Sequence, residues 1–256
     1  MFRPRIIPIL LLKGQGLVKT VRFSNPTYIG DPINAVRLFN DYRADELVFL
    51  DINASVEGRT ISKELTKKIG DEAYMPFSVG GGITTAEQIR DLLSRGAEKV
   101  VLNTSVSSNL SLIEQASKSF GSQSIIVSVD VRRRKSGRQD IMVKGGRERV
   151  PFLLKQYVKD IEAAGAGEIL INSIDRDGTM EGYDIYLIKE VSDAVRVPVI
   201  ACGGAGSLSD MKTAYAEGGA SACAAGSLFV FHGPRKGILI SYPEKREIVS
   251  TFTDGI

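Results

Sequence analysis

Short apolar runs of strand length recur along the whole chain. They are rich in valine, isoleucine and leucine and do not alternate strictly with polar residues, which is typical of parallel strands buried on both faces. The predicted strands are residues 5–12, 46–52, 76–79, 99–103, 124–130, 168–172, 198–201 and 221–225.

Segments with helical periodicity lie between these strands. One is predicted to begin with Asp31 as its cap and Pro32 at its first position. Another follows residues 108–109 and carries one apolar face, formed by Leu110, Ile113, Ala116 and Phe120. Eight strands alternating with helices in 256 residues predict one domain over residues 1–256, an α/β fold of the (β/α)8 TIM barrel type. An open doubly wound sheet is the alternative.

The same succession of apolar runs, glycines and small polar residues occurs in both halves of the chain. The first copy comprises residues 46–51, 79–82 and 102–105, and the second comprises residues 168–171, 202–204 and 224–227. Glycine lets backbone N–H groups approach an anion closely, and a following helix N-terminus adds a favourable dipole. We therefore expect two phosphate sites and a ligand with an anionic group at each end. The repeat also favours a barrel built from two (βα)4 halves.

Three segments break the regular alternation. Residues 13–30 form a long connection after the first strand, and such connections are usually lids or binding loops. Residues 132–149 form a basic excursion that contains Gly137, Gly145 and Gly146. Residues 238–242 resemble a strand where an eighth helix would be expected.

Composition excludes several classes of function. A net charge of +3 is too small to indicate nucleic-acid binding, although it suits anionic metabolites. The only histidine, His232, lies beyond the last strand, so neither a histidine triad nor a histidine metal cluster can form. We expect no metal and no cofactor. Cys202 and Cys223 lie in apolar runs typical of reduced, packed thiols, and no stretch is apolar enough to span a membrane. A cytoplasmic protein is expected.

Candidate chemistry lies at the carboxyl ends of the strands, where barrels place their active sites. Asp130 is the strongest catalytic candidate because it ends a buried apolar strand. Asp51 has the same form, and for both a structural acid bonded to loop amides is the alternative. The residues predicted to bind phosphate or substrate are Lys19, Asp51, Gly81, Gly82, Asn103, Thr104, Asn172, Asp177, Gly178, Gly203, Gly204, Gly226 and Ser227.

Over roughly residues 1–231 the chain resembles the HisF-type cyclase subunit of imidazole glycerol phosphate synthase. The matching segments are residues 5–8, 30–32, 45–52, 79–83, 121–123, 165–170, 173–179 and 203–206. The resemblance implies a (β/α)8 fold made by duplication and a ribonucleotide substrate with two phosphates. It also implies ammonia that arrives from a glutaminase partner through the barrel interior.

The mouth of the barrel departs from this family. The family's first strand ends in an aspartate that acts with the fifth-strand aspartate as acid and base. Here Asp130 is present, but Leu11 occupies the first-strand position and cannot transfer a proton. Asn172 and Cys202 also stand where the family has threonine and serine.

The opposite end of the barrel matches the family. The resemblance assigns a ring of charges that gates ammonia to Arg5, Glu46, Lys99 and Glu168. It also places Glu98 and Gln123 at the interface with the glutaminase. A salt-bridge floor that only closes the barrel is the alternative interpretation.

One branch of the family combines these features. HisF-like proteins of surface-polysaccharide gene clusters share the leucine-rich first strand and a tail like residues 231–234 and 240–243. They are associated with a HisH-like glutaminase and a sugar amidotransferase that forms acetamidino groups in lipopolysaccharide or O-antigen biosynthesis. The leading hypothesis is therefore ammonia conduction for the amidation of a nucleotide-linked N-acetyl sugar. The alternatives are a true cyclase lyase of histidine biosynthesis and a barrel that only supports its glutaminase.

Overall fold

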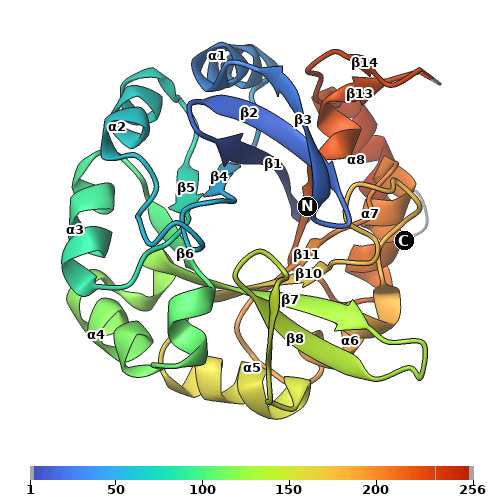
Figure 1. Ribbon diagram of the computed structural model, residues 1–256. Helices are drawn as coiled ribbons and strands as arrows, with labels where there is room; N and C mark the ends of the chain where they lie inside the picture. The colour runs from blue at the N-terminus through green and yellow to red at the C-terminus, as the bar shows by residue number, and fades with distance from the viewer. Residues whose placement is uncertain (1–2, 234, 254–256) are drawn as a thin grey trace.

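Eight parallel strands close into a barrel in the computed structural model, which describes residues 3–233 and 235–253 (Figure 1). Pairing between β7 and β10 closes the ladder, so the predicted barrel is confirmed and the open sheet is wrong. The domain prediction for residues 1–256 and the tail residue Pro234 extend outside the described residues. The barrel strands are β1 (Arg5–Lys13), β4 (Leu47–Asp51), β5 (Phe77–Gly80), β6 (Lys99–Leu102), β7 (Ile125–Arg133), β10 (Glu168–Ser173), β11 (Val199–Cys202) and β12 (Ala222–Ala225).

A ring of helices surrounds the barrel (Figure 1). The Asp31 side chain caps the first helix by accepting a hydrogen bond from the backbone N–H of Asn34 at 2.9 Å, as the sequence predicted. The helices are α1 (Pro32–Tyr42), α2 (Lys63–Glu72), α3 (Ala86–Ser94), α4 (Ser111–Phe120), α5 (Leu154–Ala163), α6 (Ile185–Ser192), α7 (Leu208–Ala216) and α8 (Lys245–Thr253). Short 3-10 turns are η1 (Thr104–Ser107), η2 (Ser122–Ser124) and η3 (Ser227–Phe229).

The strands bury apolar side chains on both faces. The outward side chains pack under the helices, with Phe39 and Phe49 among the largest that are fully buried. The inward side chains form a second, separate cluster along the barrel axis. This inner cluster consists of Ile7, Ile9, Val48, Val101, Ile126, Leu170, Ile200, Cys202, Ala222 and Ala224. Burial on both faces explains why the strand sequences lack alternation.

The long connection after β1 and the basic excursion after β7 are largely strands rather than irregular loops. Residues 13–30 contain β2 (Gly16–Val21) and β3 (Ser24–Gly30), and β2 pairs antiparallel with β1. Residues 132–149 include the end of β7, β8 (Gln139–Val143) and the start of β9 (Glu148–Val150). Both additions extend barrel strands beyond the mouth, where backbone pairing replaces exposure to water.

The strand-like interpretation of residues 238–242 is wrong for most of the segment. The segment enters a strand only at Ile238, the end of β14 (Gly237–Ile238), which pairs with β13 (Phe231–His232). Leu239 and Ser241 donate single backbone hydrogen bonds to Val230 and Phe229, and α8 supplies the eighth helix. The apolar character of the segment reflects anchoring instead, because the buried Tyr242 hydroxyl donates to the Ile6 carbonyl at 3.0 Å. Within the described ranges, no helix has the length and apolar character needed to cross a bilayer.

Candidate functional site

Two cavities open at the carboxyl ends of the strands, and the predicted mouth residues line them. The larger has a volume of about 640 Å³ and the smaller about 30 Å³. The larger is lined by Asp51, Gly81, Gly82, Asn103, Thr104, Asp130, Asn172 and Asp177 among others. The smaller is lined by Lys19, Asp177, Gly178, Gly203, Gly204, Gly226 and Ser227 among others. The structure therefore brings both halves of the repeat to one mouth.

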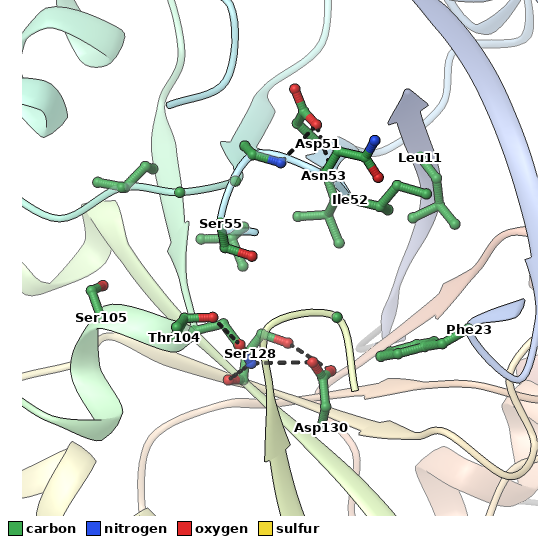
Figure 2. A pocket seen from close by; sticks show the side chains of 18 of the residues that line it. Leu11, Phe23, Asp51, Ile52, Asn53, Ser55, Thr104, Ser105, Ser128 and Asp130 are labelled. Carbon is green, nitrogen blue, oxygen red and sulfur yellow. Dashed lines mark hydrogen bonds between the residues drawn. The ribbon is translucent and has the colours of Figure 1, made fainter. Parts of the chain in front are cut away.

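Asp130 lies on the wall of the larger cavity (Figure 2), and it accepts hydrogen bonds from three side chains. Asn103 donates from its amide at 3.2 Å, and Ser128 and Asn172 each donate at 3.4 Å. The Asn172 carbonyl oxygen Oδ1 is buried and has no partner among the described residues. Asp130 thus has a fixed orientation, while Asn172 retains one free acceptor.

Burial raises the pKa of Asp130 to about 7. The Asp177 carboxylate raises it further, whereas the hydrogen bonds from Asn172, Ser128 and Asn103 oppose the increase. A carboxyl group with a pKa near neutrality can both accept and donate a proton at physiological pH. The alternative of a purely structural acid bonded to loop amides does not fit, because the donors to Asp130 are side chains.

Lys19 and Asp177 are oppositely charged groups that both line the smaller cavity. Lys19 projects from β2 and donates to the Ile9 carbonyl, and Thr20 donates to Asp177 at 3.3 Å. Burial lowers the pKa of Lys19 to about 8 against the attraction of Asp177. Burial also raises the pKa of Asp177 to about 6 against the attraction of Lys19. The β2–β3 hairpin therefore places Lys19 in the wall of the smaller cavity.

Asp51 has the structural role that the sequence offered as its alternative. Its carboxylate accepts from the backbone N–H groups of Asn53 and Ala54, each at 3.1 Å. Arg59 donates to the same carboxylate at 2.6 Å. Asp51 therefore orders the loop after β4 and presents Arg59 beside the larger cavity.

Leu11 stands on the cavity wall across from Asp130 in Figure 2. It lies at the end of the inward column of β1, after Ile7 and Ile9. Leu50 from the neighbouring strand β4 also lines this wall. The mouth thus has a carboxylic acid on β7 and an apolar surface on β1, where the resemblance implied a second acid.

The glycines that repeat in the two halves are required by the backbone itself. Gly82 has φ +63°, and a Cβ there would lie 1.8 Å from the Arg59 carbonyl oxygen. Gly204 has φ +116°, and its Cβ would lie 2.2 Å from the Gly182 carbonyl oxygen. Any side chain at either position would clash with backbone. A valine substitution would therefore disturb the fold, and it cannot report on anion binding alone.

At the opposite end of the barrel, Arg5, Glu46, Lys99 and Glu168 form a closed ring of alternating charges, here called the charged ring. Arg5 bonds to Glu46 and lies 3.0 Å from Glu168. Lys99 lies 3.4 Å from Glu46 and 2.9 Å from Glu168. Each of the four charges lies at, or one residue before, the start of its barrel strand. The geometry is compatible both with a gate and with a structural floor.

One carboxylate oxygen of the charged ring has no hydrogen-bond partner among the described residues. Burial would lower the pKa of Arg5, but the charges of Glu168 and Glu46 outweigh it and raise that pKa. Glu168 Oε2 is buried and has no hydrogen-bond partner in the described structure. This oxygen therefore remains available to a small donor at the end of the barrel axis.

Glu98 and Gln123, the residues expected to face a partner, are exposed at this same end, just before β6 and β7.

Two residues that the sequence reasoning missed also shape the site. Ser128 lies two positions before Asp130, so strand periodicity places both on the inward face. That spacing was a usable signal. No sequence signal pointed to Arg59, because its position depends on how the loop after β4 wraps around Asp51. No group of three or more potential metal ligands occurs in residues 3–233 and 235–253.

The chain is similar in sequence to known proteins. The profile of a family described as "Histidine biosynthesis protein" matches residues 5–234. A Pseudomonas aeruginosa protein, provisionally named imidazole glycerol phosphate synthase subunit hisF2, is 46% identical over 248 residues, covering 97% of this chain and 99% of that protein. A Leptospira borgpetersenii protein, provisionally named subunit HisF of the same synthase, is 44% identical and covers 95% and 96%.

A third relative carries the synthase name without qualification. The imidazole glycerol phosphate synthase subunit HisF of Alkaliphilus metalliredigens is 44% identical over 232 residues. The match covers 91% of this chain and 92% of that protein. The similarity therefore extends across the barrel and both cavities.

The buried acid should make stability depend on pH. Because the pKa of Asp130 is about 7 in the folded chain and about 3.9 when unfolded, folding loses stability as pH rises between these values. The loss can reach about 4 kcal/mol. Asp130→Asn should therefore gain stability relative to the unmodified chain as pH increases from 4 to 8, measured by thermal denaturation. Asp51→Asn is the control and should be destabilised at pH 8. A constant difference for Asp130→Asn across this range would contradict the assignment.

Inorganic phosphate should bind in the larger cavity. The backbone N–H groups near Gly82 and Thr104 supply donors, whereas the smaller cavity has room for only about two waters unless Lys19 moves. Ser105→Ala should weaken phosphate binding by about five- to tenfold, because the Ser105 hydroxyl lines this cavity and has no hydrogen-bond partner among the described residues. Amide chemical shifts measured during a phosphate titration would show this. Shifts confined to residues outside both cavities would refute the prediction.

Proposed function

The chain belongs to the histidine biosynthesis protein family, and from that premise we propose that it is a HisF-type subunit that conducts ammonia. It receives ammonia from a HisH-like glutaminase at the charged ring and releases it at the mouth. The acceptor is the N-acetyl group of a nucleotide-linked sugar, which a separate amidotransferase converts to an acetamidino group. In the proposed assembly the chain forms a heterodimer with the glutaminase. This heterodimer delivers ammonia to the amidotransferase.

The observation that carries this proposal is the layering of the barrel interior. A charged ring lies at one end, an apolar cluster fills the middle, and a polar mouth lies at the other end. On β10 a single column passes through all three layers, with Glu168, Leu170 and Asn172 facing inward. Such layering suits a small neutral molecule that enters at one end and leaves at the other.

The physical chemistry of ammonia fits these layers. Glu168 Oε2 offers an unpaired acceptor at the receiving end, and Asn172 Oδ1 offers another at the mouth. An ammonium ion would be strongly disfavoured in the apolar middle, because burying an unpaired charge is very costly. Neutral ammonia can cross that region without this penalty. The side chains must shift slightly to let it pass, since proteins pack their interiors closely.

The leucine at position 11 favours release of ammonia at the mouth over catalysis of imidazole ring closure there. Ring closure in the family uses two acids, and only Asp130 is present here. A positioned proton-transfer group is typically worth 10²–10⁴-fold in rate. The apolar wall formed by Leu11 and Leu50 removes that contribution while leaving the path along the axis intact.

The cyclase of imidazole glycerol phosphate synthase is the second candidate, and specific observations favour it. The relatives carry that name, one of them without qualification. The larger cavity has the volume for a phosphorylated ligand, and the pKa of Asp130 suits acid–base chemistry. In this case Asp130 would act with Asp177 or with a group of the substrate.

A coupled assay separates the two candidates. The chain is mixed with its glutaminase and glutamine, and supplied either with the imidazole precursor or with a nucleotide-linked N-acetyl sugar and its amidotransferase. Amidated sugar without imidazole product supports the proposal. Imidazole product at rates that match glutamine consumption would establish the cyclase instead.

Lys99→Met should uncouple glutamine hydrolysis from amidation. The variant removes the cation between Glu46 and Glu168, so the ring can no longer alternate in charge. Glutamine hydrolysis should continue while the amidated product per glutamine falls severalfold. Thermal denaturation is measured in parallel, because loss of one partner from a buried pair can cost about 3–5 kcal/mol. Lys67→Met, at an exposed site on α2, is the matched control. A folded Lys99→Met variant with an unchanged ratio would rule out the gate.

Leu11→Asp should raise cyclase turnover with free ammonium. The new carboxyl group would face Asp130 across the cavity and supply the missing proton transfer, worth at most about 10²–10⁴-fold. Asn172 and Cys202 limit the gain because they differ from the family's residues at the mouth. Leu11→Asn has the same shape without the acid and should show no gain. Equal turnover of the unmodified chain and both variants would mean that the first-strand acid is dispensable.

A further inference from the structure

The excursion after β7 concentrates positive charge, and we call residues 132–149 the basic hairpin. It contains eight arginines and lysines and two acidic residues, which gives it a charge of +6. The whole chain has a net charge of +3, so the remaining residues sum to −3. The charge is therefore segregated onto one projecting element.

A single buried carboxylate organises the outer end of the basic hairpin. Asp140 pairs with Arg134, with Arg138 at 3.3 Å and with Arg149 at 3.4 Å. Burial would raise the pKa of Asp140, but the three arginines outweigh it and lower that pKa. One carboxylate cannot neutralise three guanidinium groups. Their side chains are 36–59% exposed, so they present a preorganised cationic surface.

The basic hairpin stands at the rim of the mouth. Its strand β7 carries Asp130 inside the barrel and continues outward, and Gly145 and Arg147 at the opposite turn line the larger cavity. Ion pairing of Arg133 with Asp184 and a hydrogen bond from Gln139 to Glu190 hold the hairpin over α6. Figure 1 shows the β7–β8 hairpin projecting past the helical ring beside α6.

Exposed apolar side chains accompany this charge. Leu153 at the start of α5 is 81% exposed and Tyr186 in α6 is 84% exposed. Leu153 lies three residues after the end of β9, and Tyr186 lies one helical turn before Glu190, which contacts the hairpin. Arginine and tyrosine are enriched at the centres of protein interfaces, and the exposed leucine adds apolar surface that a partner could bury.

We propose that the basic hairpin, with Leu153 and Tyr186, is the docking surface for an acidic face of the amidotransferase that consumes the ammonia. This inference rests on the proposed function, in which ammonia leaves the mouth for a separate enzyme. Docking at the rim would place that enzyme over the larger cavity and keep ammonia from escaping into solvent. The glutaminase occupies the opposite end, so the two partners do not compete.

A protein partner fits better than a nucleic acid. The positive charge covers one hairpin and does not continue as a stripe over a chain whose remainder is net negative. A protein surface can bury Leu153 and Tyr186, whereas a phosphate backbone gains little from an exposed leucine. The complementary surface is therefore acidic at its rim with an apolar centre.

The test compares binding of the amidotransferase to the chain–glutaminase complex by biolayer interferometry. Lys135→Glu with Arg138→Glu lowers the charge of the hairpin by four while keeping Arg134 and Arg149 on Asp140. The association rate should fall about tenfold or more at low salt, and less at high salt. Lys67→Glu with Lys68→Glu on α2 makes the same change in net charge elsewhere and should have no effect. Tyr186→Ala should accelerate dissociation.

The outcomes are distinct. Loss of binding in the hairpin variant alone supports the proposal. Equal binding of both charge variants, or no complex with the amidotransferase at all, overturns it. Binding of a single-stranded oligonucleotide that is lost only in the hairpin variant would assign the surface to nucleic acid and also overturns it. Amidation measured with the same proteins reports separately on the proposed function, because product can form by diffusion of ammonia without docking.

Discussion

Closure of the parallel ladder between β7 and β10 constrains where every other feature of the molecule can lie. A closed sheet has no edge, so the inward side chains of all eight strands share one interior. Strand periodicity then selects every second residue for that interior. Along β10 these are Glu168, Leu170 and Asn172, and each belongs to a different layer. One geometric constraint thus produces the charged ring, the apolar middle and the polar mouth.

The mouth concentrates groups whose ionisation is disturbed by burial. The pKa of Asp130 is raised to about 7 and that of Asp177 to about 6, while that of Lys19 is lowered to about 8. Buried titratable groups that converge on a cavity are typical of functional sites. These three groups line the two cavities, which makes the mouth the candidate functional site although Leu11 replaces the second acid.

Much of this arrangement could be predicted from the sequence, because strand ends depend on local apolar runs. All eight barrel strands lie within a few residues of their predicted positions, and the mouth residues converge as parallel strands require. The position of Lys19 could not be derived in this way. It depends on a hairpin bound to the opposite half of the barrel, where the Arg22 N–H donates to the Asp177 carbonyl at 2.9 Å. The hairpin in residues 132–149 could not be derived from local pattern either, since it depends on ion pairs of Asp140 with three arginines.

The most direct test of ammonia conduction follows the nitrogen atom itself. Glutamine labelled with ¹⁵N in its amide is supplied to the assembled chain, glutaminase and amidotransferase in buffer that contains excess unlabelled ammonium. Mass spectrometry then gives the fraction of ¹⁵N in the amidated sugar. Conduction through the barrel predicts that the product retains nearly all of the label. A product whose label is diluted to the proportion found in free ammonium would show that ammonia passes through solvent, and would contradict the account.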